Sequence, residues 1–121
     1  MNKNIFQSLV EFDRPIKELS HKMGNVGWNW DEEPLAILTR DHLISALERY
    51  ISRHIPVEDI QEWAFNIDGL EIIGYEKGYE TLIRNVVESL NLEPDQGLLL
   101  TPHRAKELIF QLKTGQYDPN D

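Results

Sequence analysis

The amino-acid sequence predicts an all-α fold, a compact bundle of four to six helices with short connections. Apolar residues recur at intervals of three and four in several separate stretches, which is the spacing of one face of an α-helix. Threonine, proline and glycine stand at the ends of these stretches, where helices begin and end. The chain has 121 residues, 40% of them hydrophobic, which is enough for one core. We therefore expect a single helical domain over residues 1–115 and a frayed C-terminal tail at 116–121.

The N-terminal part is predicted to form two short helices and an ordered loop. Residues 5–12 have helical spacing, and a proline suits the first turn of a second helix over residues 15–23. Two glycines, two tryptophans and a proline then break the periodicity over residues 24–34. We expect Trp28 and Trp30 to cover one end of the bundle, with binding of a partner as the alternative.

Two longer helices are predicted in the middle of the chain. Thr39 offers an N-cap hydroxyl to a helix over residues 40–53. A helix over residues 57–67 follows, with an apolar stripe on one side and acidic residues on the other, and Gly69 is expected to cap its end. Trp63 is predicted to pack at the margin of the core, and a role in partner binding is the alternative.

The C-terminal part is predicted to contain two more helices. Residues 70–75 are apolar but are expected to form a connection, because a lone strand would have nothing to pair with. A helix over about residues 75–91 and a turn-rich linker over 91–97 follow. Thr101 then caps a last helix, expected over residues 102–113.

The negative charge is concentrated in one stretch, residues 58–95. This stretch holds ten carboxylates and only two cations, a charge of −8 out of a net −9 for the chain. If the acidic residues of its two helices share one side, with tyrosines beside them, that side suits a basic protein partner. The alternative is that the acidity serves solubility alone. The candidate partner-binding residues are Glu58, Asp59, Glu62, Tyr75, Glu76, Tyr79 and Glu80.

The same composition argues against several classes of partner and location. An acidic surface lacks the lysines and arginines that neutralise phosphates, so we expect no direct contact with nucleic acid or an anionic membrane. The longest apolar run is far too short to cross a bilayer, and the first residues lack the pattern of a signal peptide. The chain has no cysteine, which suits a reducing compartment. We therefore expect a soluble, cytoplasmic protein.

No catalytic or metal-binding motif is present in the sequence. The nucleophile, phosphate-loop and zinc-helix patterns are all absent, so we expect no enzyme activity, no catalytic residue and no cofactor. The three consecutive acids at residues 31–33 diverge along the chain and do not form a calcium loop, so no metal site is expected there. The four histidines lack the spacing of a zinc helix and are assigned to surface or capping roles; they are His21, His42, His54 and His103.

Four short segments, taken in order, resemble a known class of bacterial proteins. They are LTRDHL at 38–43, EWA at 62–64, IGYE at 73–76 and LTP at 100–102. Together they resemble small acidic helical immunity proteins, including those that accompany colicin-type and contact-dependent growth inhibition toxins. The resemblance covers residues 38–112. It implies a cytoplasmic inhibitor that binds and neutralises a cognate bacterial toxin, and it assigns no contact residue. We expect the toxin to be a nuclease, because a cleft that holds a polyanion is basic and suits an acidic face.

Two other classes of function remain open. One is an interaction or regulatory module, for example a homodimer, because the sequence does not decide the oligomeric state. The other is a small hydrolase that uses Asp31, Glu33 or neighbouring carboxylates. That hydrolase would need a concave site and a carboxyl group that titrates near neutral pH.

Overall fold

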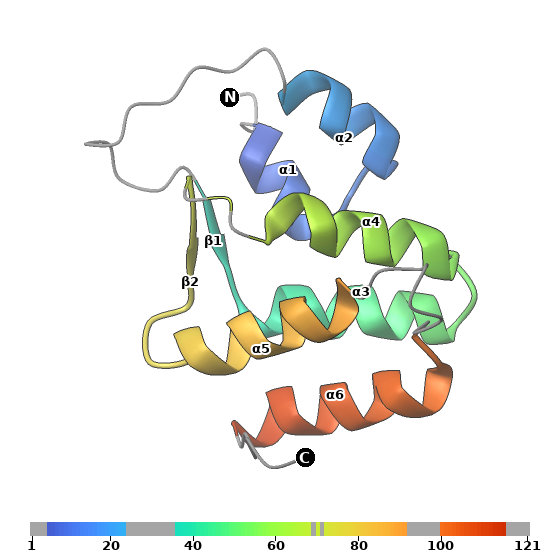
Figure 1. Cartoon of the computed structure of the whole chain (residues 1–121), viewed down its shortest axis with the longest axis vertical. Helices are drawn as coiled ribbons and strands as arrows, with labels where there is room; N and C mark the ends of the chain where they lie inside the picture. Colours follow the sequence, from blue (N-terminus) through green and yellow to red (C-terminus); the bar gives the residue numbers. More distant parts are fainter. Residues whose placement is uncertain (1–4, 24–35, 69, 71, 92–99, 116–121) are drawn as a thin grey trace.

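The computed structural model describes residues 5–23, 36–68, 70, 72–91 and 100–115 (Figure 1). Within these residues the all-α class is confirmed, with the addition of a small sheet. In chain order the elements are α1 (Ile5–Glu11), α2 (Ile16–Met23), β1 (Ala36–Leu38), α3 (Arg40–Ile51), α4 (Val57–Ile67), β2 (Ile73–Tyr75), α5 (Glu80–Leu90) and α6 (Pro102–Thr114). The predictions for Trp28, Trp30, Gly69, the 91–97 linker beyond Asn91 and the tail fall outside the described residues.

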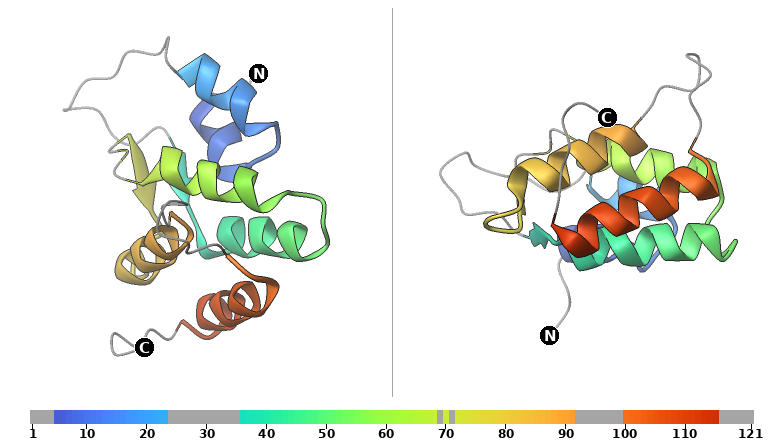
Figure 2. Two further views of the ribbon diagram at one scale, coloured as in Figure 1. Left: turned by 45° about the vertical axis from the view of Figure 1, so that its right-hand side comes forward. Right: turned by 90° about the horizontal axis from the view of Figure 1, so that it is seen from below.

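The last four helices form the main body of the bundle. Successive helices from α3 to α6 run in alternating directions, as short connections predict (Figure 1). The most extensive contact joins α3 and α6, and α4 packs against α5, α3 and α2. The α1–α2 hairpin lies on the opposite side of α4 from α6 (Figure 2). The buried side chains from both parts form one continuous core.

A capping box begins α3, as the position of Thr39 predicts. The Thr39 hydroxyl accepts a hydrogen bond from the His42 backbone N–H at 3.3 Å, and the Thr39 N–H donates to Nδ1 of His42 at 3.0 Å. Because Nδ1 accepts, the imidazole is neutral, and its burial lowers the pKa of His42. His42 therefore has a capping role, one of the two roles expected for the histidines.

A Schellman motif ends α3 with an arginine in the position that glycine usually takes. The His54 N–H donates to the Arg49 carbonyl at 2.9 Å, and the Arg53 N–H donates to the Tyr50 carbonyl at 3.0 Å. Arg53 itself is left-handed, with φ of 68°. An L-residue with a side chain is strained in this region, so Arg53 costs stability relative to glycine.

Replacing Arg53 by glycine should therefore raise the free energy of unfolding, by about 1 kcal/mol. The arginine side chain is exposed and the hydrogen bonds of the motif come from the backbone, so the change removes only the strain. Urea unfolding followed by circular dichroism measures the difference. Gly115 is the matched control, since it ends α6 at φ of 72° and a Cβ there would lie 3.2 Å from the Tyr79 ring. Gly115→Ala should destabilise, and a loss of stability in Arg53→Gly would contradict the assignment.

Trp63 is the largest fully buried side chain and joins the N-terminal hairpin to the bundle. It lies three residues after Ile60 and four before Ile67, so it belongs to the apolar stripe of α4. Its indole stacks on Phe12 with ring centroids 5.1 Å apart, and its Nε1–H donates to the Leu9 carbonyl at 2.6 Å. The prediction that Trp63 packs in the core is confirmed, but its place is inside the core and not at the margin, and the side chain is not exposed to a partner.

The expectation of a plain connection at residues 70–75 is wrong. Residues 73–75 form β2, which pairs in parallel with β1, and Ile73 lies opposite Ala36 in the register. The Glu76 N–H extends the ladder to the Leu38 carbonyl at 2.9 Å. No sequence pattern indicates the partner strand, because β1 has only three residues and directly precedes the cap of α3.

The predicted start of the following helix, at about residue 75, is also wrong. Residue 75 is held in β2, and α5 begins only at Glu80. Between them Gly78 adopts φ of 91°, a conformation that ends the extended segment in a turn and is not helical. The last helix begins and ends within one residue of its predicted range, and the Thr101 hydroxyl accepts from the Arg104 N–H at 3.1 Å as expected.

Candidate functional site

The outer face of α4 carries acidic side chains and one large aromatic side chain. Glu62 is four residues after Glu58, and Phe65 is three residues after Glu62, so the three project from the same side of the helix. Both glutamates are exposed, and Phe65 is 67% exposed. Asp59 lies beside them and is half-buried. We call Glu58, Asp59, Glu62 and Phe65 the α4 face.

Within the described residues the charges of the α4 face are not paired with cations, although Asp59 lines a pocket together with Arg14 and Arg49. Among the described residues, the carboxylates of Glu58, Asp59 and Glu62 form no ion pair with lysine or arginine. Glu58 and Asp59 stand in the first turn of α4, where the positive end of the helix dipole favours them. The negative field of this face is therefore available to a molecule that approaches from solvent.

Phe65 belongs to this face but was not among the candidates from the sequence. The helical period does contain the signal, because a residue two positions after the buried Trp63 points to nearly the opposite side. Phe65 carries no charge, so the charge pattern of the sequence does not indicate it. A lone exposed aromatic is common on protein surfaces, and the interest of Phe65 lies in the uncompensated carboxylates beside it.

Two other predicted contact residues, Glu76 and Tyr79, interact with Arg40 of the same chain. The guanidinium donates to the Glu76 carboxylate from Nε and Nη2, each at 3.2 Å, and the Arg40 backbone N–H donates to it at 3.0 Å. The same guanidinium lies 3.6 Å from the centroid of the Tyr79 ring. The hydrogen bonds from Arg40 lower the pKa of Glu76. The charge of Glu76 is thus neutralised by Arg40, and its carboxylate accepts a hydrogen bond from the first backbone N–H of α3.

The remaining two candidates lie near this network and away from the α4 face. Tyr75 is in β2, half-buried, and burial raises the pKa of its hydroxyl. Glu80 is exposed at the start of α5 and accepts from the Gly78 N–H at 2.9 Å. Since α4 and α5 run in opposite directions, their N-terminal ends lie at opposite ends of the pair (Figure 1). The predicted set therefore divides into two separate groups, and contact of either with a partner stays a prediction.

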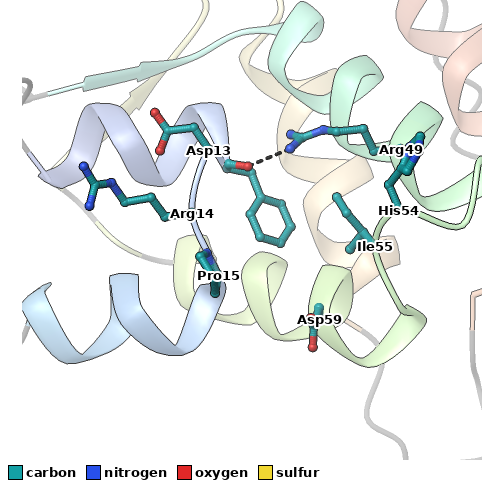
Figure 3. A pocket seen from close by; sticks show the side chains of 8 residues that line it. Asp13, Arg14, Pro15, Arg49, His54, Ile55 and Asp59 are labelled. Carbon is teal, nitrogen blue, oxygen red and sulfur yellow. Dashed lines mark hydrogen bonds between the residues drawn. The ribbon is translucent and has the colours of Figure 1, made fainter.

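A pocket of about 300 Å³ lies between the α1–α2 turn and the α3–α4 turn (Figure 3). It is lined by Phe12, Asp13, Arg14, Pro15, Arg49, His54, Ile55 and Asp59. Arg49 is held by the end of α1, because Nη1 donates to the Phe12 carbonyl at 2.7 Å and Nη2 to the Glu11 carbonyl at 3.1 Å. Figure 3 shows Asp13 and Asp59 on opposite sides of the pocket, where they do not form a carboxylate pair. The pocket is therefore the gap where the two turns meet, and it has no pair of carboxylates for hydrolysis.

The hydrolase and metal hypotheses find no supporting geometry in the described residues. Asp31 and Glu33 lie outside those residues. The pKa of Glu76 is lowered, which is the wrong direction for a carboxyl that must donate a proton near neutral pH. In the part of the chain that the structure describes, no group of three potential ligands gathers at one point.

Comparison of the chain with protein-family models, with curated proteins and with solved structures gives no match. Over the described ranges, none of the helices has the length and apolar character required to span a membrane.

Proposed function

We propose that this protein is an immunity protein, a non-enzymatic inhibitor that binds a basic bacterial toxin through the α4 face. The observation that supports this most directly is the grouping of Glu58, Glu62 and the exposed Phe65 on one helix side, where neither glutamate forms an ion pair with a described lysine or arginine. The resemblance of residues 38–112 to immunity proteins supports the same class. The partner is a nuclease domain, whose cleft is positively charged because it holds a polyanion.

The two kinds of side chain on the α4 face have different roles in this proposal. The carboxylates attract the basic partner over a distance and raise the association rate above the roughly 10⁵ to 10⁶ M⁻¹s⁻¹ of unsteered encounters. Phe65 fills an apolar recess on the partner and slows dissociation, since aromatic anchors carry much of the energy of protein interfaces. An inhibitor of a lethal enzyme needs both rapid capture and slow release.

The test begins with the product of the gene directly upstream, where a toxin gene is expected to lie. That product should co-purify with this protein, and its toxicity should disappear on co-expression. In the complex, Glu58→Lys with Glu62→Lys should slow association about tenfold at low salt, and the effect should shrink as salt is added. Phe65→Ser should mainly raise the dissociation rate. Stopped-flow mixing measures both rates.

A matched control separates the α4 face from net charge. Glu48 on α3 and Glu88 on α5 are both exposed, so Glu48→Lys with Glu88→Lys changes the total charge equally at other places. This control should leave the association rate within about twofold, since distant charges are screened. Absence of a complex with the upstream product, or an equal slowing in the control, would overturn the proposal.

A further inference from the structure

The outer face of α6 is basic, although the chain as a whole is acidic. Lys106, Phe110 and Lys113 follow one another at intervals of four and three, so they share one side of the helix. Phe110 is 64% exposed, and both lysines are exposed. The opposite side of α6 is buried and lies in the core with α3. We call Lys106, Phe110 and Lys113 the α6 face.

The lysines of the α6 face are available for an external partner. Within the described residues neither Lys106 nor Lys113 forms an ion pair. The one carboxylate nearby in the sequence, Glu107, is engaged by Arg104 at 3.4 Å and by His103 at 3.2 Å. The α6 face therefore combines two uncompensated positive charges with an exposed aromatic ring.

The α4 and α6 faces are complementary to one another. On α4, Glu62 lies three residues before Phe65, and Asp68, whose carboxylate also accepts from the Asn91 side-chain amide at 2.9 Å, lies three residues after it at the C-cap. On α6, lysines lie four residues before and three residues after Phe110. With a rise of about 1.5 Å per residue, each aromatic ring has charges about 4.5 to 6 Å to either side along its helix axis. Two such helices placed side by side bring ring against ring and carboxylate against lysine, in either direction.

We propose that the α6 face of one copy of this chain binds the α4 face of a second copy. Each chain carries both halves of the contact, and they are different surfaces with α3 and α5 between them (Figure 2). A contact between unlike surfaces leaves one α4 face and one α6 face free at the ends, so further copies add. A single pair of helices buries less than the roughly 1,200 Å² of a stable interface, so the association is weak and sensitive to salt.

Sedimentation velocity of the full chain over a micromolar to millimolar series measures this association. At low salt the average mass should rise with concentration, and high salt should suppress the rise. Variant A, Lys106→Glu with Lys113→Glu, and variant B, Glu58→Lys with Glu62→Lys, should each associate at least tenfold more weakly than the wild type. Mixing A with B restores opposite charges across both contacts, so the mixture should associate where neither variant does alone.

Two results would overturn the proposal, namely a wild-type protein that stays monomeric throughout the series, or a mixture no heavier than A or B alone. Circular dichroism of both variants checks that they are folded. Variant A keeps the native α4 face, so it should still bind the upstream gene product as the wild type does. Failure of self-association therefore does not contradict the inhibitor proposal, and failure to bind the upstream gene product does not contradict the self-association proposal.

Discussion

Replacing Trp63 by alanine should lower the free energy of unfolding by about 3 to 5 kcal/mol, the cost of removing a large side chain from a packed core. The indole is fully buried, stacks on Phe12 and donates to the Leu9 carbonyl. Its removal opens a cavity between α4 and the α1–α2 hairpin and leaves the Leu9 carbonyl with one of its two donors, the Phe12 N–H at 3.1 Å. Since a domain of this size has a total stability of about 5 to 15 kcal/mol, the variant should be partly unfolded on mild heating.

Urea unfolding followed by far-ultraviolet circular dichroism measures this loss. Trp63→Phe is the matched control, because it keeps an aromatic ring against Phe12 but removes the Nε1–H donor. It should cost less than alanine, about 1 kcal/mol for the lost hydrogen bond, because the Leu9 carbonyl keeps the Phe12 N–H as a donor. Equal stability of Trp63→Ala and the wild type would show that the hairpin does not depend on this contact.

Replacing Glu76 by alanine should be the next most damaging change, with a loss of about 2 kcal/mol. Its carboxylate accepts three hydrogen bonds from Arg40, and bonds to a charged group contribute more than neutral ones. The expected loss is small for three bonds to a charged group, because the side chains of Arg40 and Glu76 both remain more than a quarter exposed. The loss leaves the first backbone N–H of α3 without its carboxylate partner.

The contribution of Glu76 should depend on pH in a defined direction. Arg40 lowers the pKa of Glu76 below its ordinary value of 4.5, so the folded state favours the ionised form. The contribution is therefore fully present above the unfolded pKa and is lost as the pH falls through the folded value. The difference in unfolding free energy between wild type and Glu76→Gln should be constant above about pH 5 and shrink below it. A difference that grew in acid would contradict the assignment.

The helices could be predicted because their signals are local. The caps at Thr39 and Thr101, and the repeats of apolar residues, lie within a few positions of the helices they specify. The sheet was not predicted because its paired residues, such as Ala36 and Ile73, are 37 positions apart along the chain, and each strand has only three residues. Pairing of this kind depends on contacts at long range, which periodicity does not record.

The candidate site was predicted in part. The sequence located the acidic stretch and the outward direction of Glu58 and Glu62, and the exposed position of Phe65 follows from the same helical period. It grouped Glu76 and Tyr79 with them, because all lie within one acidic stretch. The structure instead places Arg40, 36 residues before Glu76, against both of these side chains.

The sequence by itself determined the helical class of this protein, the caps of its helices and the face that each helix turns to solvent, since these depend on neighbouring residues and a fixed period. Tertiary structure alone decided which charged side chains pair with one another within the chain and which remain unpaired at the surface. An ion pair such as Arg40–Glu76 depends on how distant segments pack, and packing also places Glu58 and the start of α5 at opposite ends of the α4–α5 pair (Figure 1).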